Sequence, residues 1–565
     1  MNAIFLVIFS LFCFYLSIRY YGRFLDNKIF DMNSNEPTPA HRFRDGMDYV
    51  PTAKPVLFGH HFTSIAGASP IVGPAIAVIW GWIPAVLWIV LGSIFMGAVH
   101  DFGSLSISVK HDGSSIGNTA ADIIKKRART LFLFIVFFLI FFVLAVFAYI
   151  IATLFVQYPT TVIPINAQII IAIIVGYLFY RKKIKILIPS LIALLFLYFF
   201  IWVGIKFPIS IPPMLGISPL QIWIILLMIY SFIASVLPVW VLLQPRDYIN
   251  SHQLIVGLSL MFIGVFVVNP KIVAPAVQAS PEGAPLIIPF LFVTIACGAI
   301  SGFHSLVSSG TTSKQLNKMI DGRTIGYGGM ILEGCLALMA LVAVSAGFSS
   351  RADWLTHYAS WSQANSMGAK IGAFLIGGSR FLSALGIPEE FGVSLIGVLV
   401  IAFAATTLDT ACRIQRYIIS EIGKSYNIKL IQNRYLASGI AASSALALAL
   451  IKGGGEGGLI LWPLFGATNQ LISGLALFVI TVYLYKKGKP VIYTLIPMIF
   501  IALISTASMI FNLGKYINTH NWLLAVLGII ILGLEAWLIS EGILVIRRRK
   551  IIKKQPTKRI TEEIF

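Results

Sequence analysis

Charged residues are scarce in this sequence. Asp, Glu, Lys and Arg together make up 11% of its 565 residues, whereas 58% are hydrophobic. Soluble globular domains contain about 25% charged residues, so that class is excluded. Many apolar runs reach the roughly 20 residues that cross a bilayer as a helix, and the short alternating segments of a β-barrel are missing. The sequence therefore predicts an all-α polytopic membrane protein.

Cysteine is rare as well. The four cysteines all lie within apolar runs, at Cys13, Cys297, Cys335 and Cys412. We therefore expect small core residues, and neither disulfides nor a zinc site. The chain also lacks the H-E-x-x-H, G-x-S-x-G and Walker A motifs, which argues against an enzyme and against an ATP-driven pump. No cofactor is expected apart from a coupling ion, H⁺ or Na⁺.

The apolar runs predict about fifteen transmembrane helices. The first run lacks the basic flank and the A-x-A site of a cleaved signal peptide, so it counts as a span. Residues 366–386 are less apolar and contain Lys370 and Arg380, so we expect an interfacial or re-entrant helix there. The predicted spans are 3–21, 56–80, 83–108, 131–156, 166–180, 184–206, 220–243, 253–269, 286–309, 328–347, 391–411, 434–451, 458–484, 491–512 and 522–546.

Basic residues predict the orientation of these spans. The formal net charge is +20, and Lys and Arg gather in short loops such as 109–130 and 181–185 and in the C-terminal tail. The positive-inside rule places these segments in the cytoplasm, which puts the N-terminus outside and the C-terminus inside the inner (cytoplasmic) membrane. The charge is thus explained without nucleic acid. The expected partners are the lipid bilayer and a small carboxylated substrate, and a homo-oligomer is left open.

One run, residues 56–78 (VLFGHHFTSIAGASPIVGPAIAV), is apolar but interrupted. Broken backbone is tolerated in a membrane where protein buries it or water lines it, so we predict a discontinuous transmembrane helix at a binding site. The alternative is a proline-kinked packing helix whose histidines lie near its wet end. The residues that weaken helical pairing are Gly59, Gly67, Pro70, Gly73 and Pro74, and the polar ones are His60, His61, Thr63, Ser64 and Ser69.

A second interruption is predicted at Pro238, in the run 220–243, five spans after the first. Two five-helix units of opposite topology, each opening with a broken helix, are typical of inverted-repeat secondary transporters of the leucine-transporter type. The predicted divisions are 1–55 (first helix and cytoplasmic loop), 56–210 (first repeat), 211–425 (second repeat) and 426–565 (additional C-terminal helices and basic tail).

Several hydroxyl side chains lie at and just after the end of the 286–309 run. In the leucine-transporter-like fold the helix at this position supplies hydroxyls to a sodium site that faces the first broken helix. Capping or packing of the helix end is the alternative. The hydroxyls are those of Ser305, Ser308, Ser309, Thr311 and Thr312.

Ionisable residues inside membrane spans are costly and are functional candidates for that reason. Histidine titrates near neutral pH and can carry a proton or pair with a carboxylate. The predicted substrate- and ion-binding residues are Gly59, His60, His61, Thr63, Ser64, Gly67, Ser69, His304, Ser308, Ser309, Thr311 and Asp409. The predicted gating or structural residues are His100, Asp101, Arg246, Asp247 and Glu333.

Several of these residues have alternatives. Neighbouring residues on a helix do not face one another, so a His100–Asp101 pair is not expected. Asp409 can instead form a structural pair with Arg413, four residues on, and Glu333 can cap a helix start. Four histidines, His60, His61, His100 and His304, can also converge on a transition metal, although no H-x-x-x-H or C-x-x-C spacing supports a metal site.

Seven runs carry a resemblance that covers residues 25 to 485. They are GHHFTSIAGASPIVGPAIAVIWGW, LGSIFMGAVHDF, QPRDY, CGAISGFHSLVSSGTTSKQL, GYGGMILEG, TTLDTACR and WPLFGATNQ. With these runs the chain resembles the carbon starvation protein (CstA) family. The resemblance implies an inner-membrane transporter that takes up peptides or pyruvate under nutrient limitation, distantly similar to the amino acid–polyamine–cation superfamily and its inverted-repeat fold.

The sequence thus predicts a secondary active transporter that imports a small carboxylated nutrient, peptides or pyruvate, during starvation. Proton coupling through His60 or His61 and one carboxylate is the first hypothesis. Sodium coupling through the hydroxyls of the 286–309 run is the second. A membrane sensor or scaffold and a metal-binding membrane protein remain as alternatives from other classes.

Overall fold

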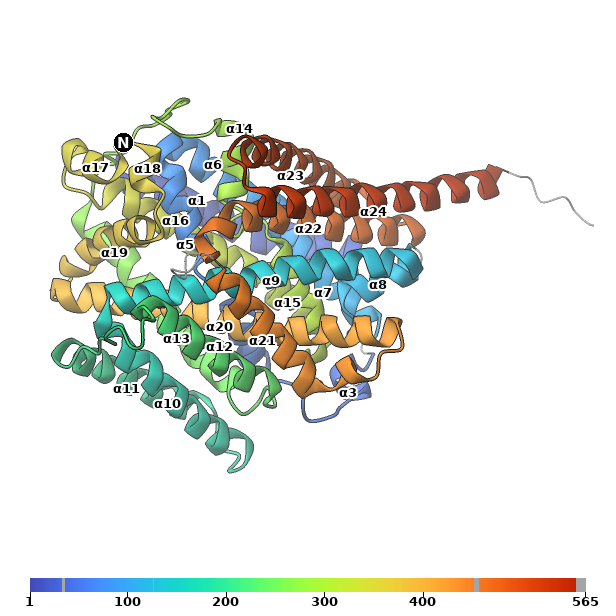
Figure 1. Ribbon diagram of the computed structural model, residues 1–565, viewed down its shortest axis with the longest axis horizontal. Helices are drawn as coiled ribbons and strands as arrows, with labels where there is room; N and C mark the ends of the chain where they lie inside the picture. Colours follow the sequence, from blue (N-terminus) through green and yellow to red (C-terminus); the bar gives the residue numbers. More distant parts are fainter. Residues whose placement is uncertain (33–35, 125, 452–456, 555–565) are drawn as a thin grey trace, which may run out of the picture.

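The computed structural model describes residues 1–32, 36–124, 126–451 and 457–554, and within these ranges it contains helices and no strands (Figure 1). Short π-helical turns at Ser17–Tyr21 and Leu25–Phe30 extend the first helix to Phe30, beyond the predicted end at residue 21. The α-helices are α1 (Ala3–Leu16), α2 (Gly22–Phe24), α3 (Pro39–Arg42), α4 (Lys54–Ala66), α5 (Ser69–Ala77), α6 (Trp82–Gly92), α7 (Ala98–Lys110), α8 (Ile116–Ile123), α9 (Lys126–Gln157), α10 (Val162–Tyr180), α11 (Leu187–Lys206), α12 (Pro219–Val236), α13 (Leu243–Val268), α14 (Ile287–Thr294), α15 (Gly302–Gly310), α16 (Gly328–Ala346), α17 (Arg351–Tyr358), α18 (Trp361–Ala364), α19 (Met367–Ser383), α20 (Glu389–Ser425), α21 (Arg434–Leu450), α22 (Gly457–Lys486), α23 (Ile492–Asn518) and α24 (Trp522–Lys554).

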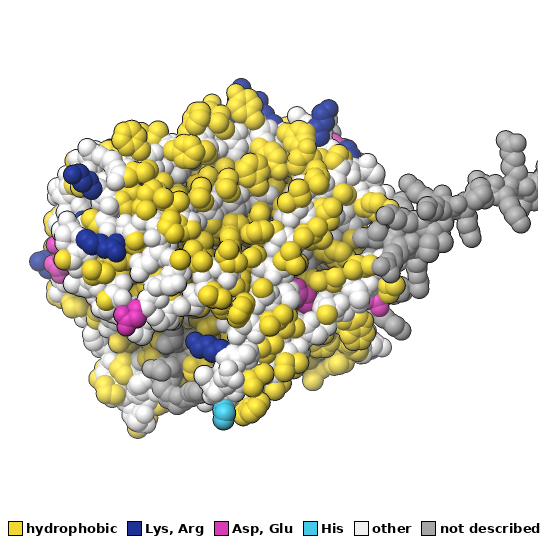
Figure 2. All heavy atoms as spheres, turned by 90° about the horizontal axis from the view of Figure 1, so that it is seen from above, with side chains coloured by type: hydrophobic (Ala, Val, Ile, Leu, Met, Phe, Trp, Pro, Cys, Tyr) yellow, Lys and Arg dark blue, Asp and Glu magenta, His cyan; other side chains and the backbone are white. Residues whose placement is uncertain are grey.

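The helices confirm a multi-pass membrane protein. Within the described ranges, twelve are long and apolar enough to cross a bilayer, and the bent pair α4–α5 makes a thirteenth candidate. Two more predicted spans correspond to the interrupted pair α14–α15 and to α21, an apolar helix of 17 residues. The total of about fifteen spans stays a prediction. Hydrophobic side chains are spread across the face in Figure 2, as expected for a surface in contact with lipid.

The predicted break in the first of these pairs is confirmed. Helix α4 ends at Ala66, Gly67 has φ +49°, and α5 begins at Ser69 with a bend of 42°. A Cβ at Gly67 would lie 2.9 Å from the Thr407 hydroxyl, so glycine is required here both for backbone conformation and for space. Pro70 follows at the start of α5, where its missing N–H breaks no hydrogen bond.

The predicted break at Pro238 is wrong. Helix α12 ends at Val236 and α13 begins at Leu243, so Pro238 lies in a turn between two separate helices. The second interruption lies instead between α14 and α15, over residues 295–301. A Cβ at Gly302 would lie 2.2 Å from the Asn469 carbonyl oxygen. Glycine therefore lets the start of α15 approach the backbone of α22, and this close approach accompanies the break.

Helix α19 covers the segment that was expected not to cross the membrane. It has 17 residues and is not among the helices that meet the length and hydropathy of a span. Its Arg380 donates to the Gly347 carbonyl and to Asp353, both at 2.9 Å, whereas its Lys370 is buried. The interfacial or re-entrant character of α19 stays a prediction.

Candidate functional site

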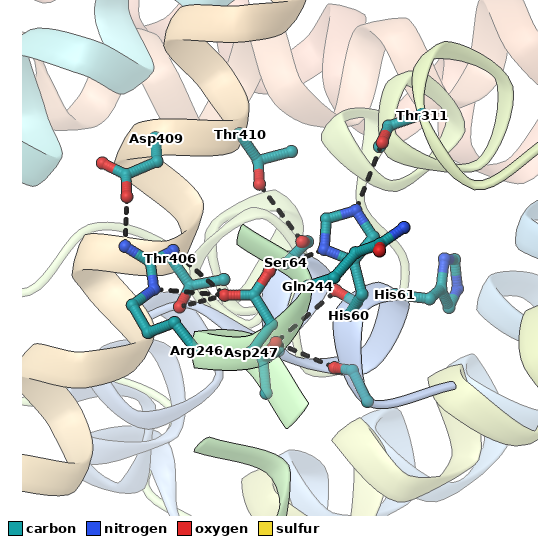
Figure 3. Close-up of polar contacts among 12 residues, drawn as sticks. His60, His61, Ser64, Gln244, Arg246, Asp247, Thr311, Thr406, Asp409 and Thr410 are labelled. Carbon is teal, nitrogen blue, oxygen red and sulfur yellow. Dashed lines mark hydrogen bonds and ion pairs between the residues drawn. The ribbon is translucent and has the colours of Figure 1, made fainter. Parts of the chain in front are cut away.

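The break in α4–α5 lies beside a buried cluster of charged residues, shown in Figure 3. His60, on α4, lies within hydrogen-bonding distance of two other elements. Its Nδ1 lies 2.6 Å from Oδ2 of Asp247 on α13, and its Nε2 lies 3.2 Å from the Thr311 hydroxyl, just after α15. The imidazole and the carboxylate are both fully buried. His60 therefore connects the broken helix to α13 and to the end of α15.

The hydrogen bonds of His60 suit two protonation states. With Nδ1–H donating to Asp247, a neutral ring accepts from the Thr311 hydroxyl at Nε2, and a protonated ring donates to the Thr311 oxygen instead. The Thr311 oxygen also accepts a hydrogen bond of 2.7 Å from Gln315. A hydroxyl can rotate to serve either state, so the site can gain or lose a proton without losing this partner.

Asp247 extends the cluster to a second carboxylate. Its Oδ1 accepts from Arg246 at 3.0 Å and from the Thr406 hydroxyl at 3.2 Å. Arg246 also forms an ion pair with Asp409, on α20, and donates to the Tyr230 hydroxyl at 2.6 Å. Tyr230 in turn donates to Asp409 at 2.8 Å.

The charge of this cluster depends on His60. We call His60, Arg246, Asp247 and Asp409 the histidine–arginine cluster. With both carboxylates ionised, its net charge is zero when His60 is protonated and −1 when His60 is neutral. All four side chains are at most 2% exposed, and a buried net charge is strongly disfavoured.

The predicted alternative for Asp409 is wrong. Arg413 does not pair with it. Its guanidinium donates to Asp48 at 2.8 Å and to the Ala234 carbonyl at 3.1 Å. Arg246 holds Asp409 instead, although the two residues are 163 positions apart. Sequence spacing favours the local partner, and the tertiary contact takes precedence here.

Asp48 lies in the loop before α4 and ties that loop to α20. It accepts hydrogen bonds from Arg413, from Arg416 at 3.2 Å and from the Tyr417 hydroxyl at 2.6 Å. Burial alone would raise the pKa of Asp48, but the two guanidinium groups outweigh this effect and hold its pKa below the ordinary value of 3.8. The loop is thus held by an ionised carboxylate.

A second cluster lies on α7, α15 and α16. Asp101 lies 2.9 Å from Nδ1 of His304 and 2.7 Å from Nδ1 of His100. Nε2 of His304 lies 3.3 Å from Glu333, and all four side chains are fully buried. The expectation that His100 and Asp101 would not face each other is wrong: one carboxylate oxygen of Asp101 lies beside His100 and the other beside His304. We call these four residues the His304 cluster.

His61 lies on the far side of His60 from Arg246 (Figure 3). Its Nδ1 lies 2.9 Å from the Thr312 hydroxyl. A Cβ at Gly329 would lie 2.9 Å from the His61 ring, and Gly329 is one turn before Glu333 on α16. The two adjacent histidines therefore face different helices, with His60 in the first cluster and His61 toward the helix that carries Glu333.

The other predicted residues either stabilise the backbone of their own helix or contact a neighbouring helix. Thr63 donates to the Gly59 carbonyl of its own helix at 2.8 Å, and Ser309 donates to the Ser305 carbonyl at 2.6 Å, so these hydroxyls stabilise local backbone. Gly59 allows α4 to approach α13, since a Cβ would lie 2.7 Å from the Ser251 hydroxyl. Ser64 lies 3.2 Å from the Thr410 hydroxyl, across to α20.

Several buried polar atoms have no hydrogen-bond partner among the described residues. Such atoms are rare in native proteins and call for an explanation by water, an ion or a ligand. They are distributed over the molecule, and those near the helix breaks and the two clusters include Ser69 Oγ, Ser308 Oγ, His61 Nε2, His100 Nε2, Glu333 Oε1 and Asp409 Oδ1. Within the part of the chain that the structure describes, no three His, Cys, Asp or Glu side chains are arranged to hold a metal ion.

Sequence reasoning missed some members of the network. Tyr230, Thr406 and Asn250 bridge α12, α13 and α20, and Asn250 donates to the Thr406 hydroxyl at 3.0 Å. Asn250 had a usable signal, because it lies two residues after the QPRDY run. Tyr230 had none, since tyrosine is common in membrane helices.

Comparison with known proteins gives a family match, similar curated proteins and a similar solved structure. The family model described as carbon starvation protein CstA matches residues 2–347 and 344–508. The peptide transporter CstA of Campylobacter jejuni is 33% identical over 563 residues, covering 88% of this chain and 79% of the relative. The pyruvate/proton symporter BtsT of Escherichia coli K12 is 32% identical over 583 residues, covering 89% and 81%. Among solved structures, the Eremococcus coleocola manganese transporter bound to an aromatic bis-isothiourea substituted compound matches with a TM-score of 0.47 at 15% identity, covering 89% of this chain and 99% of that one.

Proposed function

The chain belongs to the carbon starvation protein CstA family, and on this basis we propose that it is a proton-coupled secondary active transporter that imports a small carboxylated nutrient. The similar proteins are named as a peptide transporter and as a pyruvate/proton symporter, so pyruvate and short peptides are the substrates to test. The histidine–arginine cluster is the observation that carries the coupling part of the proposal.

Proton coupling follows from the charge of that cluster. Protonation of His60 makes the buried set neutral, and loss of the proton leaves it at −1. A ligand shifts a conformational equilibrium only through differential affinity for the two states. A proton on His60 would have such an effect, because His60 connects α4, the first half of the broken helix, to the charged pair on α13. Proton binding would therefore favour the closely packed arrangement of these helices.

Sodium coupling is supported less well. The hydroxyls proposed to hold sodium are mostly engaged, since Thr311 contacts His60, Thr312 contacts His61, and Ser309 bonds backbone. Ser308 has a buried oxygen without a hydrogen-bond partner among the described residues. One hydroxyl alone falls short of the several oxygen ligands that a sodium ion needs.

The packing of the helices supports an inverted repeat with revised boundaries. The two interrupted pairs, α4–α5 and α14–α15, would each open a repeat. Helix α9 packs on α20, α12 on α21, α13 on α4, and α22 on α15, which is the pairing expected when two similar units of opposite topology interlock. The repeats would comprise α4–α7, α9, α12 and α13, and then α14–α16 and α20–α22, with α10 and α11 at the periphery (Figure 1).

Uptake by reconstituted protein tests the proposal. Labelled pyruvate or alanyl-alanine would be added outside the proteoliposomes. Either an inward proton gradient or an inward sodium gradient would then be imposed. We expect accumulation above equilibrium with the proton gradient alone. Accumulation driven by sodium alone would transfer the coupling to the hydroxyls. Absence of protein-dependent flux for both substrates would favour a sensor or scaffold.

A further inference from the structure

A cavity of about 350 Å³ leads from the loop before α14 to the break in α4–α5. Its lining includes Gly283 and Trp361 and also Ser69, at the first position of α5. We call this space the lysine cavity after Lys370 of α19, which lines it. Its volume lies in the range of small-molecule sites, and it is separate from the histidine–arginine cluster, none of whose residues lines it.

Lys370 occupies an unfavourable position. Its side chain is 1% exposed, and it makes no hydrogen bond or ion pair with any residue that the structure describes. It also lies in the first turn of α19, whose start is capped by Ser366 accepting from Ala369 N at 3.1 Å. The positive end of the helix dipole and burial both disfavour an ammonium group there. The Trp462 ring, 5.4 Å from Nζ, offsets this in part.

The rest of the lining points to an anionic ligand. Lys370 and Lys515 line the cavity, whereas no described Asp or Glu does. Ser69 is 7% exposed and lines the cavity, and its hydroxyl has no hydrogen-bond partner among the described residues. It stands at the N-terminus of α5, a helix of nine residues whose dipole also favours an anion. An ammonium group and a hydroxyl donor thus converge on one apolar-walled space.

We propose that Lys370 binds the carboxylate of the transported substrate in the lysine cavity, with the Ser69 hydroxyl as a second donor and Trp462 as an apolar wall for the rest of the molecule. This inference rests on the proposed function, because it assigns a recognition residue for the same solute. A carboxylate offsets the cost of the buried ammonium group, which explains why α19 carries a lysine at this position.

Uptake kinetics of matched variants test the assignment. Wild-type protein, Lys370→Met, Lys370→Arg and Lys271→Met would be compared with labelled alanyl-alanine in proteoliposomes under a proton gradient. Lys271 is an exposed loop lysine outside the cavity, so its variant controls for general attraction of anions. Loss of a charge-assisted hydrogen bond should raise KM about 10- to 100-fold in Lys370→Met, with partial recovery in Lys370→Arg and less than about a twofold change in Lys271→Met.

A second measurement separates recognition from a structural role. Uptake would be inhibited by glycylglycine or by glycylglycine amide, which lacks the carboxylate. Wild-type protein should prefer the acid by about tenfold or more, and Lys370→Met should lose that preference. An unchanged preference, or equal KM changes in the Lys370→Met and Lys271→Met variants, would overturn the assignment while leaving transport intact. Absence of uptake by wild-type protein would overturn the proposed function as well. If Lys370→Met fails to fold, Lys370→Gln and Ser69→Ala make the same comparison.

Discussion

Replacing His60 by glutamine removes the titratable group from the histidine–arginine cluster and keeps its contacts. A glutamine side chain can donate to Asp247 and accept from Thr311, the two partners that His60 has at 2.6 and 3.2 Å. It cannot take up a proton. The cluster would then hold a fixed charge of −1, because Arg246 alone balances two carboxylates.

The magnitude follows from the count of protons. One titrating site in the cluster corresponds to one proton per cycle, and an electroneutral symport of one proton with one pyruvate anion limits accumulation to about tenfold per unit of pH difference, or about 1.4 kcal/mol. In His60→Gln this driving force is lost and the ratio should fall to about one. The cost in folding should be about 3–5 kcal/mol, since glutamine leaves the buried cluster with an uncompensated charge of −1.

The assay is the steady-state ratio of labelled pyruvate in proteoliposomes, with the interior one pH unit more alkaline and the voltage clamped at zero. Protein-free liposomes correct for passive entry of the acid. His252→Gln is the matched control, because His252 lies on α13, the helix that carries Asp247, and its hydrogen bond among the described residues is to the Tyr248 carbonyl at 2.8 Å. His60→Gln should keep exchange of internal for external pyruvate. A variant that still concentrates pyruvate about tenfold would show that the proton binds elsewhere.

Three further predictions concern the loop, the second break and the second cluster. Asp48→Asn should lower the free energy of unfolding by about 1–3 kcal/mol at pH 7. Because the folded pKa of Asp48 is depressed, its stabilising contribution is present above pH 3.8 and is lost as the pH falls through the folded pKa. The thermal melts of variant and wild type should therefore converge in acid, and a constant difference in Tm would contradict this account. Gly302→Ala should cost about 1–3 kcal/mol by overpacking against the Asn469 carbonyl, measured as a lower Tm, and an unchanged Tm would mean that α15 can shift freely. Glu333→Gln removes the carboxylate 3.3 Å from His304, and loss of one partner of a buried pair costs about 3–5 kcal/mol, so its Tm should fall further than that of Gly302→Ala; a smaller fall would indicate that the pair is uncharged.

The first helix break could be predicted from sequence because its causes are local. Gly67 supplies a left-handed backbone conformation and Pro70 begins a new helix, and both are visible as residue types. The second break has no proline within it. It is accompanied by the approach of Gly302 to the backbone of α22, which is a tertiary contact. Pro238 led to a wrong prediction, because a proline can end a helix at a loop as well as interrupt a helix within the membrane.

Side-chain partners were less predictable than the residues themselves. The intramembrane ionisable residues were recognisable because each is costly in an apolar run. Their pairing was not, because local spacing offered Arg413 to Asp409, whereas packing of α13 on α20 supplies Arg246. In the sequence, Lys370 is only a charged residue in a weakly apolar segment. Only the folded structure shows that it lines the same cavity as Ser69.

The two proposed sites meet on the same broken helix. His60 lies in the middle of α4, before the break, and Ser69 opens α5 immediately after it. A carboxylate held by Ser69 and Lys370 would fix α5 against α19, and a proton on His60 would fix α4 against α13. Neither ligand alone then constrains both halves of the pair. Obligatory coupling requires that the conformational change proceed with both ligands bound or with neither. A helix divided at Gly67 would meet this requirement, because a different ligand would fix each half in place. The break, more than either site, would then be what couples proton and solute.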